Sequence, residues 1–282
     1  MPESPLQEIV CCMGQPVAGN PTQFMMERAF AAAGLDWQYL TLEVSAGNLG
    51  DAVRGMRAMG FRGANFLVPH KGTVLPYLDE LTEAAQLVGA VNCVHRQETR
   101  LIGMNTEGPS FLQALRAVTD PAGKNYVILG AGEVARALAV EVGRAGAAEI
   151  TIVNRTAERG QALVELLKER VKVAAKLVHL SGDYSVEEST HIVINATPIG
   201  QEDDEPVVPL DEATLRPQMV VADVVFNPPL THLLRMAAAR GCTTLDGVAM
   251  LVNQAIIGFR TWTGVEPDAT TMREALEEYL EI

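Results

Sequence analysis

The stretch YVILGAGEVARALAVEVGRAG, residues 126–146, decides the fold of this 282-residue chain. An apolar run, a glycine turn and an amphipathic stretch follow one another, which predicts a strand, a tight turn and a helix. Gly130, Gly132 and Ala135 then match the dinucleotide fingerprint, in which glycines let a pyrophosphate approach and a small residue lets the helix pack on the strand. The pyrophosphate would lie at the helix N-terminus, where N–H groups favour anions. The alternative is a turn with a purely structural role.

The end of the next predicted strand, EITIVNRT (149–156), discriminates between cofactors. An acidic residue there would accept hydrogen bonds from the ribose 2′-hydroxyl of NAD. The chain instead has Asn154, Arg155 and Thr156, and Arg159 follows one helical turn later. Guanidinium groups make charge-assisted contacts with phosphate, so this set predicts NADP, whose ribose carries a 2′-phosphate. The alternative is that both arginines belong to a solvated helix start.

Apolar runs alternate with helical patterns on both sides of this unit, which predicts an α/β protein with mainly parallel sheets. Before it, we expect strands at 9–14, 37–44, 63–68, 90–96 and 100–105, and helices at 22–34, 47–59 and 106–118. After it, we expect strands at 191–200 and 219–226, and helices at 157–169, 247–262 and 268–281. The last two helices have apolar faces, and we expect them to pack back on the N-terminal part.

The length favours two domains. We predict a substrate-binding and catalytic domain at 1–108, completed by helices within 246–282, and a Rossmann-type NADP-binding domain at 109–245. The net charge of −13 disfavours a nucleic-acid partner. No apolar window is long enough for a membrane span, and no signal peptide is visible. The four cysteines and five histidines show no metal-binding spacing, so we expect a cytoplasmic protein without a metal site.

The stretch GANFLVPHKG (63–72) runs from a predicted buried strand almost directly into Lys71. One interpretation is that this lysine only marks the point where the chain meets water. The other is that it holds an amine at the rim of a pocket, where a proton must move.

With these residues considered together, the chain resembles the shikimate dehydrogenase family from about Gly14 to Gly264. The nucleotide-domain motifs GAGE and NRT are also similar to those of glutamyl-tRNA reductases, whereas VPHK, GAVN and NTEG are more specific. The resemblance is carried by GANFLVPHK (63–71), VGAVNCV (88–94), GMNTEG (103–108), VILGAGEVARA (127–137), VNRT (153–156), INATPIG (194–200), DVVFNPP (223–229) and DGVAMLVNQA (246–255).

The resemblance implies an active site between the two domains, where NADPH reversibly reduces 3-dehydroshikimate to shikimate in the chorismate pathway of aromatic amino acid biosynthesis. It implies that Lys71 and Glu107 form the catalytic pair, and that Asn92, Phe226 and Gln254 lie at substrate positions. A ketone oxygen that gains negative charge needs a proton and charge stabilisation, which an ammonium group supplies. The implied cofactor contacts are Gly130, Ala131, Gly132, Glu133, Val134, Asn154, Arg155, Thr156, Arg159, Ala196, Thr197, Pro198, Val224 and Gly247.

The chain departs from the family pattern at the substrate positions. Asn20 and Thr22 stand where two serines of the family bind the substrate carboxylate. Leu67 for Thr and Phe226 for Tyr each remove a hydroxyl group, and Glu107 is one methylene longer than the Asp of the family. A site built to bind a hydroxyl discriminates strongly, so losing polar partners predicts an altered substrate preference.

Three functions therefore stay open. The first is a shikimate dehydrogenase with an altered pocket. The second is a relative that acts on quinate, an aminoshikimate or another cyclic polyol. The third is a low-turnover NADP-binding sensor or assembly component. In each case we expect a small-molecule ligand, no nucleic acid or membrane partner, and a monomer or homodimer.

Overall fold

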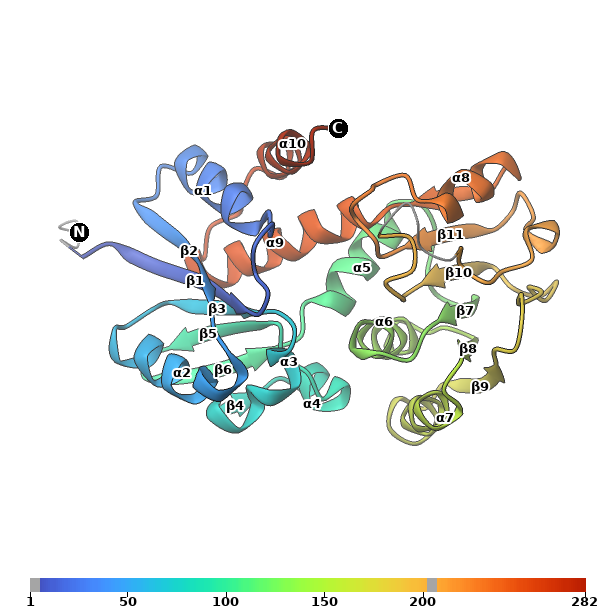
Figure 1. Ribbon diagram of the computed structural model, residues 1–282, viewed down its shortest axis with the longest axis horizontal. Helices are drawn as coiled ribbons and strands as arrows, with labels where there is room; N and C mark the ends of the chain where they lie inside the picture. Colours follow the sequence, from blue (N-terminus) through green and yellow to red (C-terminus); the bar gives the residue numbers. More distant parts are fainter. Residues whose placement is uncertain (1–5, 202–206) are drawn as a thin grey trace. The chain divides into compact units, whose positions relative to one another are not determined.

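The computed structural model describes residues 6–201 and 207–282. It divides into two compact units, one formed by Met1–Thr106 with Gln254–Ile282 and the other by Glu107–Asn253 (Figure 1). Residues 1–5, which belong to the stretch without a signal-peptide pattern, lie outside the described part of the chain. Within the described ranges, no helix is long and apolar enough to cross a membrane.

The first unit is built on a mixed six-stranded sheet in the order β2-β1-β3-β5-β6-β4. Parallel pairs join β1 to β2, β1 to β3 and β4 to β6, and antiparallel pairs join β3 to β5 and β5 to β6. The strands are β1 (Glu8–Gly14), β2 (Trp37–Glu43), β3 (Gly63–Phe66), β4 (Glu80–Leu81), β5 (Cys93–Gln97) and β6 (Arg100–Met104). The helices are α1 (Thr22–Ala32), α2 (Leu49–Ala58), α3 (His70–Thr73), α4 (Glu83–Val88), the end of α9 (Gly247–Thr263) and α10 (Ala269–Leu280).

The two C-terminal helices complete the core of this unit. The ring of Phe259 on α9 stacks on Phe30 of α1 with centroids 5.2 Å apart, and Trp262 lies 6.2 Å from Tyr39 of β2. Trp262 also donates its indole N–H to the carbonyl oxygen of Val94 at 2.9 Å. The prediction that these helices pack back on the N-terminal part is confirmed.

Gly63 makes room for this indole. A Cβ at residue 63 would lie 2.2 Å from the carbonyl oxygen of Val94 and 2.3 Å from Nε1 of Trp262. We expect Gly63→Ala to lower the free energy of unfolding by about 3 kcal/mol, because overpacking and a disturbed buried hydrogen bond act together. Denaturant unfolding measures this, with Gly47→Ala as control, since no atom lies within 4 Å of that Cβ position. Equal losses in both variants would contradict the packing argument.

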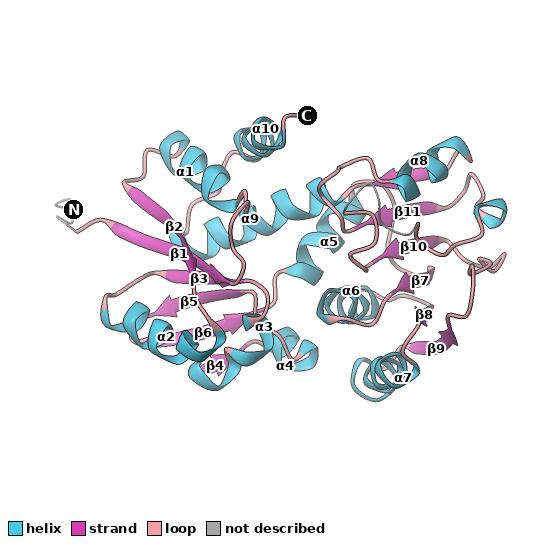
Figure 2. Ribbon diagram, viewed as in Figure 1, coloured by secondary structure: helices cyan, strands magenta, loops and turns pink. Residues whose placement is uncertain are grey.

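The second unit contains six parallel strands in the order β12-β11-β10-β7-β8-β9, drawn as arrows in Figure 2. Numbered within this unit, the order is 3-2-1-4-5-6 from β9 to β12, so the predicted Rossmann-type fold is confirmed. The strands are β7 (Asn125–Leu129), β8 (Glu149–Asn154), β9 (Ala174–His179), β10 (Ile192–Asn195), β11 (Val220–Asp223) and β12 (Thr243–Leu245). The helices are α5 (Glu107–Arg116), α6 (Glu133–Arg144), α7 (Ala157–Leu166), α8 (His232–Ala239) and the start of α9.

The strand predicted at 63–68 is shorter in the structure. β3 ends at Phe66, and Leu67 donates its N–H to the carbonyl oxygen of Met13 at 2.9 Å. Pro69 has no N–H and cannot continue a strand ladder. Lys71 consequently lies on the short helix α3 rather than at the end of a strand.

Candidate functional site

The glycine turn after β7 lies at the point where the strand order of the second unit reverses. Gly130 has a φ of 109°, and a Cβ on it would lie 3.0 Å from the carbonyl oxygen of Ala196 and 3.1 Å from Cγ2 of Thr197. The turn after β7 therefore meets the loop after β10, which is where open α/β sheets bind ligands. Around Gly132, no atom lies within 4 Å of the Cβ position, so the backbone there is accessible to a ligand.

Helix α6 starts directly after this turn. Its N-cap is Gly132, which has no side chain to cap the first N–H groups. Ala131 is buried, Glu133 is exposed and Val134 is half-buried. Uncapped N–H groups at the start of a 12-residue helix, reached through an open glycine, fit the pyrophosphate of a dinucleotide.

The turn after β8 presents two arginines to solvent. The side-chain amide of Asn154 donates to the carbonyl oxygen of Thr156 at 2.8 Å, which shapes the turn. Arg155 and Arg159 are exposed, and neither guanidinium has an ion-pair partner among the described residues. Two unpaired guanidinium groups at this strand end fit a phosphate dianion.

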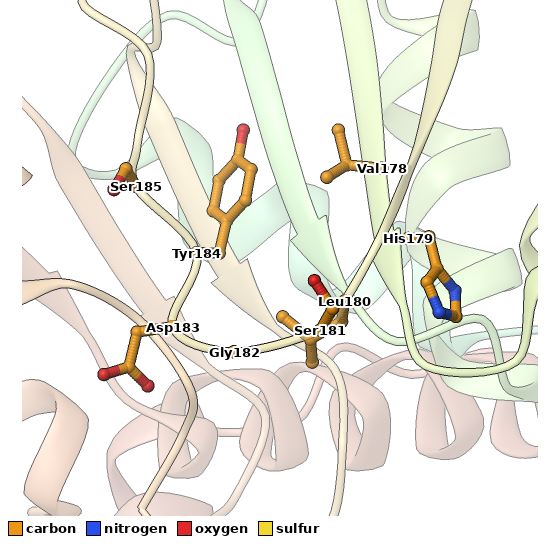
Figure 3. Close-up of a pocket in the computed structure, with 8 residues that line it drawn as sticks. All are labelled: Val178, His179, Leu180, Ser181, Gly182, Asp183, Tyr184 and Ser185. Atoms are coloured by element: carbon orange, nitrogen blue, oxygen red, sulfur yellow. The ribbon is translucent and has the colours of Figure 1, made fainter.

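A hollow of about 320 Å³ lies beside this turn, at the end of β9. Figure 3 shows its lining, which is formed by the consecutive residues 178–185. The N–H of Leu180 in this lining donates to the carbonyl oxygen of Asn154 at 3.1 Å, so the hollow and the turn are joined. None of the sequence motifs pointed to the hollow.

The remaining predicted cofactor residues gather at the ends of β10 and β11. Thr197 donates its N–H at 3.1 Å and its hydroxyl at 2.6 Å to the side-chain oxygen of Asn195. Val224 donates its N–H to the carbonyl oxygen of Asn195 at 3.1 Å. A Cβ on Gly247 would lie 2.4 Å from the carbonyl oxygen of Val225. The structure thus brings Ala196, Thr197, Val224 and Gly247 together, while Pro198 lies exposed on the same loop.

In the first unit, Asn92 clamps the turn that leads to Glu107. Its Nδ2 donates to Oγ1 of Thr106 at 2.9 Å, and its Oδ1 accepts the N–H of Thr106 at 2.7 Å. Asn65 in turn donates its side-chain amide to the carbonyl oxygen of Asn92 at 3.0 Å. Thr106 and Asn65 were not predicted as site residues from the sequence; an amide side chain inside the apolar run GANFLV was the available signal for Asn65.

Lys71 is buried close to this clamp. Its carbonyl oxygen accepts the N–H of Val91, the neighbour of Asn92, at 2.8 Å. Only 9% of Lys71 and 4% of Glu107 is exposed. Lysines and glutamates are almost never this buried without a partner, so the interpretation of Lys71 as a residue that only meets water is wrong.

In the loop after β1, one of the two residues predicted to bind the substrate carboxylate is hydrogen-bonded to the other. The side-chain oxygen of Asn20 accepts the N–H of Thr22 at 2.9 Å, at the start of α1. The side chain of Leu67 lies against Gly14, since a Cβ on that glycine would lie 2.9 Å from Cβ of Leu67. Gln254 is half-buried on α9 in the same unit, whereas Phe226 and Glu107 belong to the second unit.

In the described part of the chain, no group of three His, Cys, Asp or Glu side chains could hold a metal ion. An unusual titratable group is Asp223, at the end of β11, which was not predicted as a site residue from the sequence. Burial raises its pKa to about 6, although hydrogen bonds from Thr231, Val225 and Asn195 act in the opposite direction.

Three family models match this chain. The shikimate dehydrogenase substrate binding domain matches residues 12–94, the shikimate/quinate 5-dehydrogenase model matches residues 113–204, and the shikimate 5′-dehydrogenase C-terminal domain matches residues 247–277. A curated relative, the shikimate dehydrogenase (NADP(+)) of Methanopyrus kandleri, is 41% identical over 279 residues, which cover 96% of each protein.

Two solved structures show how far the similarity extends. The ligand-free 5-ketofructose reductase of Gluconobacter sp. strain CHM43 is 45% identical with a TM-score of 0.94, over 98% of this chain and 99% of that one. The shikimate 5-dehydrogenase of Thermus thermophilus, solved in complex with NADP(H) and shikimate, is 32% identical with a TM-score of 0.86, over 97% of this chain and 100% of that one. With matches of this extent in sequence and structure, the chain belongs to the shikimate dehydrogenase family.

Proposed function

We propose that this protein is an NADP-dependent oxidoreductase that reversibly reduces the ring ketone of 3-dehydroshikimate to shikimate. The observation that carries the proposal is the burial of Lys71, which is the only lysine in the residues of the first unit. The curated relatives include shikimate dehydrogenases (NADP(+)), and in an enzyme of that kind a buried amine can donate a proton to the substrate.

In this proposal, Lys71 donates a proton to the substrate oxygen and Glu107 holds the amine in its charged form. An opposite charge nearby favours the ammonium state, which stabilises the negative charge that builds on a ketone oxygen during reduction. Glu107 follows Thr106 directly in the chain, so the Asn92 clamp fixes the residue that precedes the acid. The second hydrogen on Nδ2 of Asn92 and the amide of Gln254 are proposed to bind substrate hydroxyl groups.

NADPH supplies the hydride when it is bound. We propose that residues 130–134 hold its pyrophosphate and that Asn154, Arg155, Thr156 and Arg159 hold the 2′-phosphate. The loop residues 196–198, Val224 and Gly247 would line the opposite end of the dinucleotide. The open glycine turn, the uncapped start of α6 and the two unpaired guanidinium groups support this assignment.

A second candidate is the reduction of an uncharged polyhydroxy ketone. Two observations favour it: the side-chain oxygen of Asn20 accepts the backbone N–H of Thr22, which takes that donor away from a substrate carboxylate, and the Gluconobacter structure at 45% identity is a 5-ketofructose reductase. A ketosugar has no carboxylate, so it needs no carboxylate-binding serines. The departures at Leu67 and Phe226 remove hydroxyl groups from the proposed substrate positions, and this fits either ketone.

A substrate panel tests the proposed function directly. The loss of NADPH absorbance is followed with 3-dehydroshikimate, 3-dehydroquinate and 5-ketofructose, at matched concentrations. Preference for 3-dehydroshikimate supports the first candidate, and preference for 5-ketofructose supports the second. NADPH binding without oxidation by any ketone would contradict both and favour a sensor or assembly component.

Restoring the serines tests the role of the loop. We expect the double variant Asn20→Ser, Thr22→Ser to lower the KM for 3-dehydroshikimate about tenfold, because hydrogen bonds to a charged group contribute roughly 1.5–3 kcal/mol. The KM for 5-ketofructose should not fall. Thr99→Ser, an exposed threonine in the same unit, is the control. No response to the serines, with Thr22→Ala also silent, would mean that the loop does not contact the carboxylate.

We also propose a cytoplasmic location and a monomeric or homodimeric state. All four cysteines are free and buried, which is typical of proteins from reducing compartments. Oligomeric state follows from light scattering coupled to size-exclusion chromatography.

A further inference from the structure

We propose that Asp223 is a positioning residue. Its buried side chain fixes the loops after β10 and β11, which carry proposed contacts to NADP. This inference rests on the proposed NADP function. Asp223 is the last residue of β11 and only 2% exposed. Nothing in the chemistry of hydride transfer requires a carboxylate here, so its presence in an apolar strand needs another explanation.

Three donors converge on this carboxylate. Its Oδ1 accepts the side-chain amide of Asn195 at 2.9 Å and the N–H of Val225 at 3.1 Å. Its Oδ2 accepts the hydroxyl of Thr231 at 2.7 Å. Asn195, Val225 and Thr231 are all buried and belong to the end of β10, the loop after β11 and the N-cap of α8, respectively. A single side chain therefore joins three segments.

The link to Asn195 helps to set the orientation of that amide. An ionised carboxylate only accepts hydrogen bonds, so Nδ2 of Asn195 must face Asp223 and Oδ1 must face the other way. Oδ1 then accepts both the N–H and the hydroxyl of Thr197, and Nδ2 also donates to the carbonyl oxygen of Ile199 at 3.1 Å. Of the two acceptors that hold Nδ2, Asp223 is the one that carries a charge. The path of residues 195–199 thus depends on Asp223.

This path matters for the dinucleotide because Thr197 lies against the glycine turn. Its Cγ2 would be 3.1 Å from a Cβ on Gly130, the first glycine of the fingerprint. A displaced loop would either occupy the space that a pyrophosphate and its neighbouring ribose need, or no longer pack against the glycine turn.

The link to Val225 fixes the second loop. Val225 donates its N–H to Asp223, and Val224 donates its own to the carbonyl oxygen of Asn195. On the other side, Gly247 at the start of α9 packs so closely on Val224 and Val225 that a Cβ would lie 2.4–2.7 Å from their backbone atoms. The loop is held from both sides, and Val224 and Gly247 are both proposed cofactor contacts.

The link to Thr231 serves the fold rather than the ligand. The Thr231 hydroxyl also accepts the N–H of Leu234, which caps α8. This third branch offers a matched control: Thr231→Val removes the contact with Oδ2 and the cap, and leaves both contacts with Oδ1 in place.

The test measures NADPH binding by fluorescence titration at pH 8, with the melting temperature of each variant recorded beside it. At this pH the carboxyl is ionised, since burial raises its pKa only to about 6. We expect Asp223→Ala to raise the Kd for NADPH about tenfold or more, because the loss of a buried acceptor frees the donors that hold both loops. Asp223→Asn should weaken NADPH binding less than Asp223→Ala does, since its carboxamide oxygen can still accept from Asn195 and Val225 although it carries no charge.

The remaining variants separate positioning from folding. Thr231→Val should lower the melting temperature and leave the Kd for NADPH unchanged. If Asp223→Ala does not fold, Asp223→Glu replaces it, because one extra methylene displaces the acceptor by roughly 1 Å. In steady state, the KM for NADPH should rise in Asp223→Ala while the KM for the ketone stays within about twofold.

Two results would overturn the inference. One is a folded Asp223→Ala or Asp223→Glu protein that binds NADPH as tightly as the unmodified protein does. The other is a Thr231→Val protein that loses NADPH binding as severely as Asp223→Ala, since the effect would then follow α8 and not the loops. Failure of the unmodified protein to bind NADPH is a separate outcome, which overturns the proposed function together with this inference.

Discussion

Replacing Lys71 with alanine is expected to lower kcat by a factor of about 100 to 10,000, the range that general acid catalysis contributes. The Kd for NADPH should stay unchanged, because every proposed cofactor contact belongs to the second unit and Lys71 to the first. Turnover is measured on the best ketone of the substrate panel, and NADPH binding by fluorescence. Full turnover in Lys71→Ala on that ketone would remove the lysine from the mechanism.

Because Lys71 is buried, its removal also affects packing, and a double-mutant cycle separates the two effects. Glu107→Gln alone should lower kcat, since the amine loses the charge that favours its protonated form. If the two residues act as a pair, the double variant Lys71→Ala, Glu107→Gln should be hardly slower than Lys71→Ala alone. Fully additive losses would mean that Glu107 acts independently of the amine.

Replacing both Arg155 and Arg159 with alanine is expected to raise the KM for NADP by at least about 100-fold. Hydrogen bonds to a charged group contribute roughly 1.5–3 kcal/mol each, and neither guanidinium has another ion-pair partner in the described residues that would take up its charge. The KM for NAD should change little, because NAD has no 2′-phosphate. Initial rates with each cofactor give the ratio directly.

The control for this pair removes the same charge elsewhere in the second unit. Lys168→Ala, Arg170→Ala takes away two positive charges that lie after α7, away from the turn after β8. Its KM for NADP should stay close to that of the unmodified protein. Equal affinity of the unmodified protein for NADP and NAD would contradict the assignment of the arginines.

The parts of the fold that the sequence predicts well are those with long, regular patterns. The stretch 126–146 becomes β7, the glycine turn and α6, with boundaries within a few residues of the prediction. β9 and β12 were not predicted. β9 has the half-exposed sequence AAKLVH at a sheet edge, and β12 has only three residues, so neither presents enough periodicity to be recognised.

In the site, too, residues in local sequence motifs were predicted and contacts between distant residues were not. Lys71 and Asn92 stand in recognisable motifs, but the clamp between Asn92 and Thr106 joins residues 14 positions apart. The contact between Asn195 and Asp223 spans 28 positions. Such contacts depend on which strands become neighbours, and no spacing rule predicts them. A carboxylate inside the apolar run MVVADVVF was still a usable signal, because a buried charge requires partners.

The completion of the first unit by the end of the chain has a consequence for biosynthesis. Residues 107–253 are contiguous, so the second unit has its whole sequence while the ribosome is still at work. The first 106 residues have to wait for Phe259 and Trp262, which translation reaches only near the C-terminus. At about 5–20 residues per second, the interval from residue 106 to residue 282 is roughly 9–35 s. During this time the apolar side chains that pack on α9 in the first unit lack that contact, so we expect the first 106 residues to bind chaperones. We therefore expect the second unit to be able to fold before the first, which is the reverse of the usual N-terminal-first order of co-translational folding.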